Sequence, residues 1–125
     1  MILLVDANAL LWWLADEATL NRDAARSITD PANEILVSAA TIWEIEVKRA
    51  AGRLEAPVEL VRDLAQAEID TIAITAVDAV AAARLPIHHK DPFDRMLVAQ
   101  AVRLDATIVS RDPAFDAYGV PRLVA

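Results

Sequence analysis

The sequence predicts a single α/β domain, a three-layer α/β/α sandwich with a central parallel sheet of four to five strands. Short apolar runs that suit strands buried on both faces alternate with longer segments whose apolar residues recur at helical spacing. The segments between the runs suit crossover connections rather than hairpin turns, which favours parallel pairing. The chain has 125 residues, 56% of them hydrophobic, so we expect residues 1–125 to form one domain around one core.

Five short runs are the predicted strands. Residues 2–5 end at Asp6, and residues 35–37 are closed by Ser38. The other three strands are expected at residues 71–74, 107–109 and 122–124.

Six helices are predicted between these strands, at residues 9–14, 20–28, 40–51, 57–68, 76–85 and 93–104. Pro57 is expected to open the fourth helix, because proline suits the first helical position. Pro31, Gly52 and Pro86 follow predicted helices and are typical of the residues that end them.

Composition excludes several kinds of protein. There is no cysteine, which rules out a disulfide framework, a thiolate zinc site and a cysteine nucleophile, and which fits a reducing, cytoplasmic location. The first six residues contain no basic region and end in an acid, so we do not expect a signal peptide. No apolar run approaches the roughly 20 residues that span a bilayer, so no membrane partner is expected.

The net charge of −7 argues against nucleic-acid binding by charge alone. An acidic chain can still act on RNA if metal ions bridge its carboxylates to phosphate, or if its positive charge is confined to one patch.

Four acids are placed where a parallel sheet forms its sites. Asp6 follows the first predicted strand, Glu44 lies early in the helix after the second, and Asp94 and Asp112 lie on either side of the fourth. Sites of such sheets form outside the carboxyl ends of the strands, so these carboxylates are expected to converge. Because converging carboxylates repel one another, a cation between them is expected.

The types of ligand atom indicate which ion would be bound and which reaction it would support. Oxygen ligands, without cysteine and without a histidine at metal spacing, favour Mg²⁺ or Mn²⁺ over Zn²⁺. The matching chemistry is phosphodiester hydrolysis, in which the ion acidifies a water and offsets charge on the phosphate. Ser38 and Ser110 have no histidine partner in a recognisable arrangement, so a catalytic triad is not expected.

Each acid also has a purely structural interpretation. Asp6 can cap the following helix, and Thr41 with Glu44 has the spacing of a capping box. Glu44 and Lys48 can form a solvent-exposed pair one helical turn apart. Asp91-Pro92 and Asp112-Pro113 both have the form of an N-cap followed by proline at the first helical position.

The sequence resembles the PIN-domain ribonucleases over nearly its whole length, in particular the VapC-type toxins of bacterial type II toxin–antitoxin pairs. The motifs that carry the resemblance are LVDANALLW at residues 4–12, SAATIWEI at 38–45 with Lys48 and GRL at 52–54, HHKDPFDRMLVAQA at 88–101 and TIVSRD at 107–112. One departure is Asn8, where this subgroup often carries histidine. This difference puts in doubt whether the chain handles its substrate as the subgroup does.

The resemblance implies an RNA endonuclease that uses Mg²⁺, or Mn²⁺, held chiefly by Asp6 and Asp94. Glu44 and Asp112 would complete the catalytic set. A homodimer and a cognate antitoxin that blocks the site are also implied. Asp91 belongs to the motif, yet it precedes a proline as an N-cap does, so we place it outside the catalytic set.

Other residues allow two interpretations. Several basic side chains could bind phosphate near the acids or could simply be solvated charge: Lys48, Arg49, Arg53, His88, His89, Lys90 and Arg95. Trp12 and Trp13 are adjacent on a helix and cannot face the same way, so one is expected in the core and the other in the core or in an interface.

Two other functions fit an acid cluster on this fold. A receiver-like or phosphatase-like Mg²⁺-binding domain would phosphorylate an aspartate, but it usually has a lysine after a late strand, where this chain has Ser110-Arg111-Asp112. A non-catalytic binding module of the PIN fold is expected to have lost one or more acids, and this chain retains all four.

Overall fold

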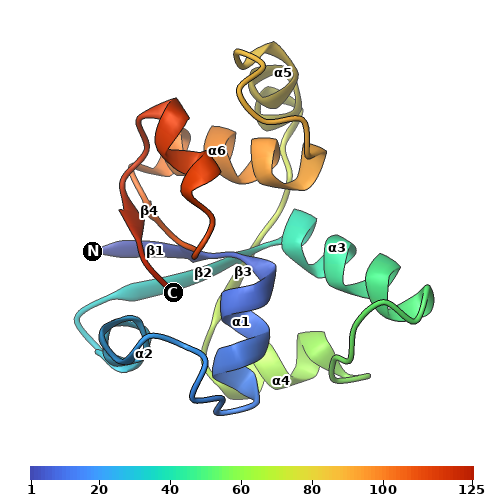
Figure 1. The fold of residues 1–125 in the computed structure, drawn as a ribbon, viewed down its shortest axis with the longest axis vertical. Coiled ribbons are helices and arrows are strands. Elements are labelled where there is room, and N and C mark those ends of the chain that lie inside the picture. The colour runs from blue at the N-terminus through green and yellow to red at the C-terminus, as the bar shows by residue number, and fades with distance from the viewer.

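The structure, a computed structural model, describes all residues from 1 to 125. A five-stranded sheet lies at the centre, with its strands in the order β3-β2-β1-β4-β5 and every neighbouring pair parallel. The strands are β1 (Ile2–Val5), β2 (Glu34–Ser38), β3 (Asp70–Ile72), β4 (Thr107–Val109) and β5 (Arg122–Leu123). The predicted parallel α/β/α sandwich is therefore confirmed (Figure 1).

Six α-helices and one 3₁₀ helix connect the strands. They are α1 (Ala7–Leu14), α2 (Arg22–Thr29), α3 (Ala39–Ala50), α4 (Leu60–Gln66), α5 (Ala76–Arg84), α6 (Pro92–Leu104) and the 3₁₀ helix η1 (Pro113–Tyr118). None of the helices combines the length and the apolarity that crossing a membrane would require.

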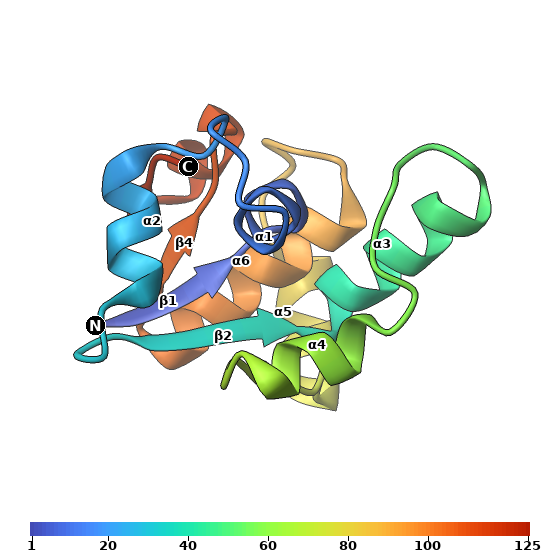
Figure 2. The same ribbon diagram turned by 90° about the horizontal axis from the view of Figure 1, so that it is seen from below.

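The sheet has a separate core on each face, because successive strand residues point to opposite sides. Leu3 and Val5 pack with residues of α1, α2 and α4, whereas Leu4 packs with α6 and with Phe115 of η1. The two views show the sheet lying between these two sets of helices (Figures 1 and 2). Since both faces are covered, the central strands are apolar at nearly every position, as the sequence predicts.

Some predicted boundaries are wrong. The second helix begins at Arg22, where Asn21 caps it by accepting a hydrogen bond from Asp23. Pro57 does not open the fourth helix, which runs only from Leu60 to Gln66. The other helices agree with prediction to within two residues at each end.

The third strand was predicted at residues 71–74 but is Asp70–Ile72. It is an edge strand that pairs only with β2, and its residues are exposed or half-buried, so it lacks a fully apolar run. The last strand ends at Leu123, one residue earlier than predicted. Residues 113–118 form the helix η1, which was not predicted, although Asp112-Pro113 has the form of a helix start.

Candidate metal centre

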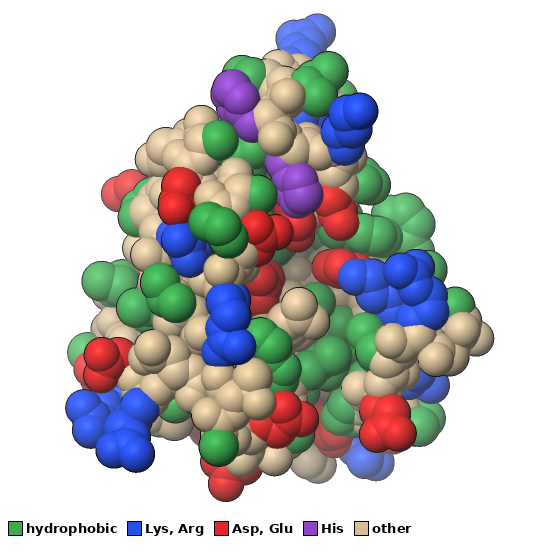
Figure 3. All heavy atoms as spheres, in the orientation of Figure 1, with side chains coloured by type: hydrophobic (Ala, Val, Ile, Leu, Met, Phe, Trp, Pro, Cys, Tyr) green, Lys and Arg blue, Asp and Glu red, His purple; other side chains and the backbone are tan.

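The four predicted acids lie around one hollow at the carboxyl edge of the sheet. β1 and β4 are neighbours in the sheet, so Asp6 after β1 and Asp112 after β4 leave it at the same edge. Glu44 comes from α3 and Asp94 from the first turn of α6. Figure 3 shows acidic side chains gathered around this hollow, with a histidine at its rim and basic side chains on both sides.

Asp6 both caps a helix and faces the other acids. Its Oδ1 accepts a hydrogen bond from the backbone amide of Ala9 at 2.9 Å, so the capping role is confirmed. Burial raises the pKa of Asp6, and the negative charges of Glu44 and Asp112 raise it further; hydrogen bonds from Ser110 and Ala9 oppose this rise. The half-buried carboxylate of Asp6 therefore lies close to two other carboxylates.

Glu44 is buried, with 7% of its surface exposed, and its Oε2 lies 2.6 Å from Nζ of Lys48. The predicted pair one turn apart is confirmed, but it is not solvent-exposed. The capping box with Thr41 is wrong, because α3 begins at Ala39 and Ser38 caps it through the amide of Ala40. Glu44 therefore lies inside the helix rather than at its start.

Asp94 contacts His89, which the sequence analysis named only as a possible phosphate ligand and not as a partner of the acids. Nε2 of His89 lies 2.7 Å from Oδ2 of Asp94. Burial raises the pKa of Asp94 to about 6, the charges of Asp91 and Glu44 add to the rise, and His89 opposes it. Glu44 therefore acts electrostatically on both Asp6 and Asp94.

Asp112 caps η1 through the amide of Ala114, at 2.9 Å. Its own amide donates to Oγ of Ser110, at 3.0 Å. Ser110 and Ser38 are fully buried and have these structural partners, so neither is the nucleophile of a triad.

Asp91 is the N-cap of α6. Its Oδ1 accepts hydrogen bonds from the amides of Phe93 and Asp94, at 2.8 and 3.2 Å. This carboxylate holds the backbone of the helix turn that carries Asp94, which is the structural role that the sequence suggested.

The residues fit a divalent cation. The pKa values of Asp6 and Asp94 are both raised, chiefly by burial and further by the negative charges of neighbouring carboxylates, and a bound cation would offset both effects. One set of three side chains has its ligand atoms all within 4.8 Å of one another: His89, Asp94 and Asp112. Asp6 and Glu44 lie outside this set, although their charges act on it.

Comparison with known families settles what kind of domain this is. Residues 3–121 match the sequence model of the PIN domain family. The chain is a PIN domain. PIN domains are nucleases, and the match covers every acid of the hollow.

Relatives of this PIN domain agree with that assignment. A protein named Ribonuclease VapC22, from Mycobacterium tuberculosis, is 27% identical over 124 residues, which cover 97% of this chain and 95% of that protein. The solved structure of FitAcB from Neisseria gonorrhoeae has a TM-score of 0.67 at 18% identity, covering 99% of this chain and 97% of the other. A toxin–antitoxin complex from Klebsiella pneumoniae has a TM-score of 0.64 at 20% identity, with coverages of 97% and 95%.

The basic residues near the acids differ in their partners. Lys48 pairs with Glu44, and Arg49 pairs with Glu46. Arg95 donates to backbone carbonyls, including those of Ala82, Leu85 and Pro86, so it is a structural residue and not a free phosphate ligand. The exposed basic side chains that remain are Arg53, His88 and Lys90.

Two expectations about this PIN domain are wrong. The sequence analysis found no histidine at metal spacing, yet His89 reaches Asp94 and Asp112. Neither tryptophan of α1 is fully buried: Trp12 and Trp13 both pack partly against the core, and the guanidinium of Arg111 lies 4.4 Å from the ring centre of Trp12.

Proposed function

We propose that this PIN domain is a divalent-metal-dependent RNA endonuclease that acts as the toxin of a bacterial toxin–antitoxin pair. The observation that carries the proposal is the crowding of Asp6, Glu44 and Asp94 at one sheet edge, where the pKa values of two of them are raised. The relative named as a ribonuclease and the similar folds solved in toxin–antitoxin complexes support it.

Asp6 and Asp94 would be the principal ligands of Mg²⁺ or Mn²⁺, and Glu44 and Asp112 would complete the acid set. The bound ion would supply positive charge to a scissile phosphate and acidify a water for attack. The acids have a further role of their own, since the helix caps formed by Asp6 and Asp112 fix where these carboxylates stand before any ligand arrives.

RNA would meet the hollow with its phosphates near basic side chains at the rim (Figure 3). Lys90 is exposed and directly precedes Asp91, and Arg53 follows the end of α3. These two side chains are our candidates for phosphate contacts, because they form no ion pair within the domain. Their positive charge would offset the overall charge of −7 locally.

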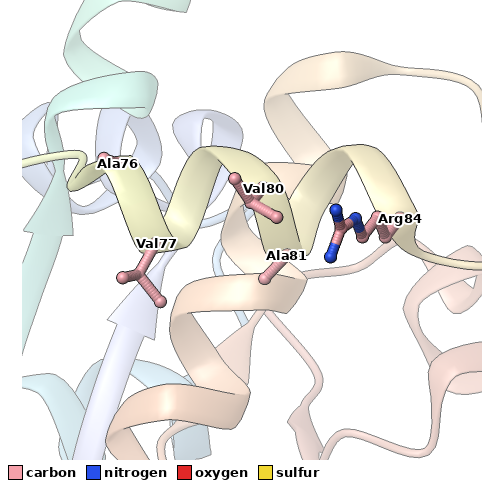
Figure 4. Close-up of a pocket in the computed structure, with 5 residues that line it drawn as sticks. All are labelled: Ala76, Val77, Val80, Ala81 and Arg84. Atoms are coloured by element: carbon pink, nitrogen blue, oxygen red, sulfur yellow. The ribbon is translucent and has the colours of Figure 1, made fainter.

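We further propose that an antitoxin covers the acid hollow and that the domain is a homodimer acting in the cytoplasm, where its RNA would be. An arginine of the antitoxin could pair with these carboxylates through two parallel hydrogen bonds. For the dimer, α5 offers a group of exposed apolar side chains, whereas the tryptophan-bearing α1 exposes no large hydrophobic side chain. Val77 and Val80 are 69% and 48% exposed beside Ala76 and Ala81 (Figure 4).

The cleavage assay uses purified protein, a labelled RNA and added Mg²⁺ or Mn²⁺. We expect cleavage that stops with chelator, and loss of most activity in Asp6→Asn and in Asp94→Asn. Asp105→Asn is the matched control, because Asp105 is exposed at the opposite end of α6 in a left-handed conformation that asparagine tolerates. Full cleavage by folded Asp6→Asn or Asp94→Asn would refute these residues as the metal ligands, and wild type that cuts no RNA with either ion would point to a non-catalytic module.

The toxin role has a separate test in living cells. Expression of the wild-type chain should arrest bacterial growth, and co-expression of its antitoxin should restore it. Asp94→Asn should be harmless at equal expression. Harmless wild-type protein that nevertheless cuts RNA in vitro would contradict the toxin role alone.

A further inference from the structure

We propose that His89 is a ligand of the metal centre, so that the site offers one nitrogen among its oxygens and prefers Mn²⁺ over Mg²⁺. The inference deepens the proposed function, from which it takes the presence of a divalent ion. It begins from the set of His89, Asp94 and Asp112, whose ligand atoms all lie within 4.8 Å of one another.

The spacing suits a shared ion. Two adjacent ligands of an octahedral ion with bonds of 2.0–2.1 Å are about 2.9 Å apart. Nε2 of His89 and Oδ2 of Asp94 are 2.7 Å apart, so small movements would let both atoms face one ion. Both side chains are mostly shielded, with exposed fractions of 26% and 18%, so few waters compete for the same space.

The backbone of His89 is held in place from both sides. Its amide donates to Oη of Tyr118 at 3.0 Å, and its carbonyl accepts from Arg95 at 3.3 Å. Arg95 is itself fixed by carbonyls at the end of α5, among them those of Ala82 and Leu85, both at 2.9 Å. The imidazole is therefore presented to the hollow by a fixed segment, as a preorganised ligand requires.

The three side chains come from different parts of the fold. His89 lies between α5 and α6, Asp94 lies in the first turn of α6, and Asp112 caps η1. No local turn or helix pairing requires an imidazole to meet both carboxylates. The competing explanation is that His89 only orients Asp94 by a hydrogen bond and never touches the ion.

A nitrogen ligand has a consequence that this competing explanation lacks. Mn²⁺ is the weakest imidazole binder of the first-row divalent ions but still accepts a nitrogen ligand more readily than Mg²⁺, which prefers oxygen, so removing the imidazole should change the ratio of the two affinities. His89→Ala should weaken Mn²⁺ binding more than Mg²⁺ binding, so that the ratio of the two affinities falls, whereas loss of a residue that only orients Asp94 should weaken both by a similar factor of about 10–100.

The matched control is the neighbouring histidine. His88 is exposed, its ring lies edge-on to Tyr118 with centroids 5.2 Å apart, and it does not belong to the set of three. His88→Ala should leave the Mn²⁺ affinity and the ratio unchanged. Calorimetry with Mn²⁺ and Mg²⁺ on wild type and both variants measures these values without any RNA.

Pulsed electron paramagnetic resonance of bound Mn²⁺ tests directly whether a histidine nitrogen is bound to the ion. Wild type and His88→Ala should show coupling to a histidine nitrogen, and His89→Ala should lose it. Wild-type protein labelled with ¹⁵N-histidine should replace the ¹⁴N signal with a ¹⁵N signal, which tests ligation even if His89→Ala fails to fold.

The outcomes separate this inference from the proposed function. Bound Mn²⁺ without nitrogen coupling, together with metal-dependent RNA cleavage, would overturn the inference and leave the function standing. Coupling that survives in folded His89→Ala would also overturn it. If wild type binds no Mn²⁺ and cuts RNA in chelator, both the inference and the metal mechanism fall.

Discussion

The ring of Trp43 lies edge-on to the ring of Phe93, with centroids 5.2 Å apart and planes 76° from parallel. Each of these aromatic residues directly precedes an acid of the hollow, Glu44 on α3 and Asp94 on α6. The contact therefore joins the two helices that present these acids. Trp43 is nonetheless 62% exposed, so the pair lies at the surface beside the hollow.

The Trp43–Phe93 contact should contribute a measurable coupling energy. A double-mutant cycle of Trp43→Ala and Phe93→Leu, followed by urea unfolding, should give about 0.5–1.5 kcal/mol. Trp43→Phe is the control and should retain most of it, since an aromatic edge remains. A coupling energy near zero would show that the two rings are neighbours without attraction.

Asp91 should matter for stability rather than for metal. Asp91→Ala should lower the free energy of unfolding by about 0.5–2 kcal/mol, because the amides of Phe93 and Asp94 lose their acceptor. Asp91→Asn should change it little, since asparagine caps about as well. Melting curves with and without Mg²⁺ check this. If Asp91→Asn abolishes stabilisation by Mg²⁺ while Asp94→Asn retains it, the roles of the two acids must be exchanged.

Asp94 should destabilise the metal-free protein above pH 6. Its pKa rises from 3.8 to about 6 on folding, so the folded protein loses stability as the pH rises through that range. Without metal at pH 8, the free energy of unfolding of Asp94→Asn should therefore exceed that of wild type by up to about 3 kcal/mol. The difference should be smaller at pH 4.5. The variant should also lose most of the stabilisation by Mg²⁺. A clearly less stable variant at pH 8 without metal contradicts the crowding argument.

Asp78 should show the opposite pH dependence. It is buried, closes a capping box with Thr75, and accepts hydrogen bonds from Gln100 and Arg103 of α6. Arg103 chiefly holds the pKa of this carboxyl below its usual 3.8, so the stabilisation is present above that pH and disappears as the pH falls further. Asp78→Asn should lower the free energy of unfolding by about 1–3 kcal/mol at pH 7. The difference from wild type should shrink from pH 5 to pH 2; one that stays constant would show that the charge of Asp78 is irrelevant.

The sequence predicted best what depends on burial and local signals. β1 and β2 are apolar at nearly every position because helices cover both faces, so their runs were visible. Asp91 and Asp112 were identified as possible caps because proline follows each of them. By contrast, β3 is an exposed edge strand, and α4 begins after Glu59, which makes no side-chain cap. Neither segment therefore has a clear pattern in the sequence.

The same distinction between local signals and long-range contacts applies to the residues of the site. Acids at the ends of parallel strands could be grouped from the topology alone. His89 could not, because its place depends on Tyr118, 29 residues away, and on the bonds of Arg95 to the end of α5. The network of Asp78 with Gln100 and Arg103 was missed for the same reason, since it joins residues more than 20 positions apart.

Ser38 ends β2 and caps α3 at the same time, so no loop separates the strand from the helix that carries Glu44. Asp6 likewise stands between β1 and α1. Each added residue turns a helix by about 100°, so a single insertion after Ser38 would rotate Glu44 away from the hollow. The segment from 51 to 59 lies between α3 and α4 and turns no acid when its length changes. Among related sequences, insertions and deletions should therefore be found in the segment from 51 to 59 and be absent from the two strand–helix junctions.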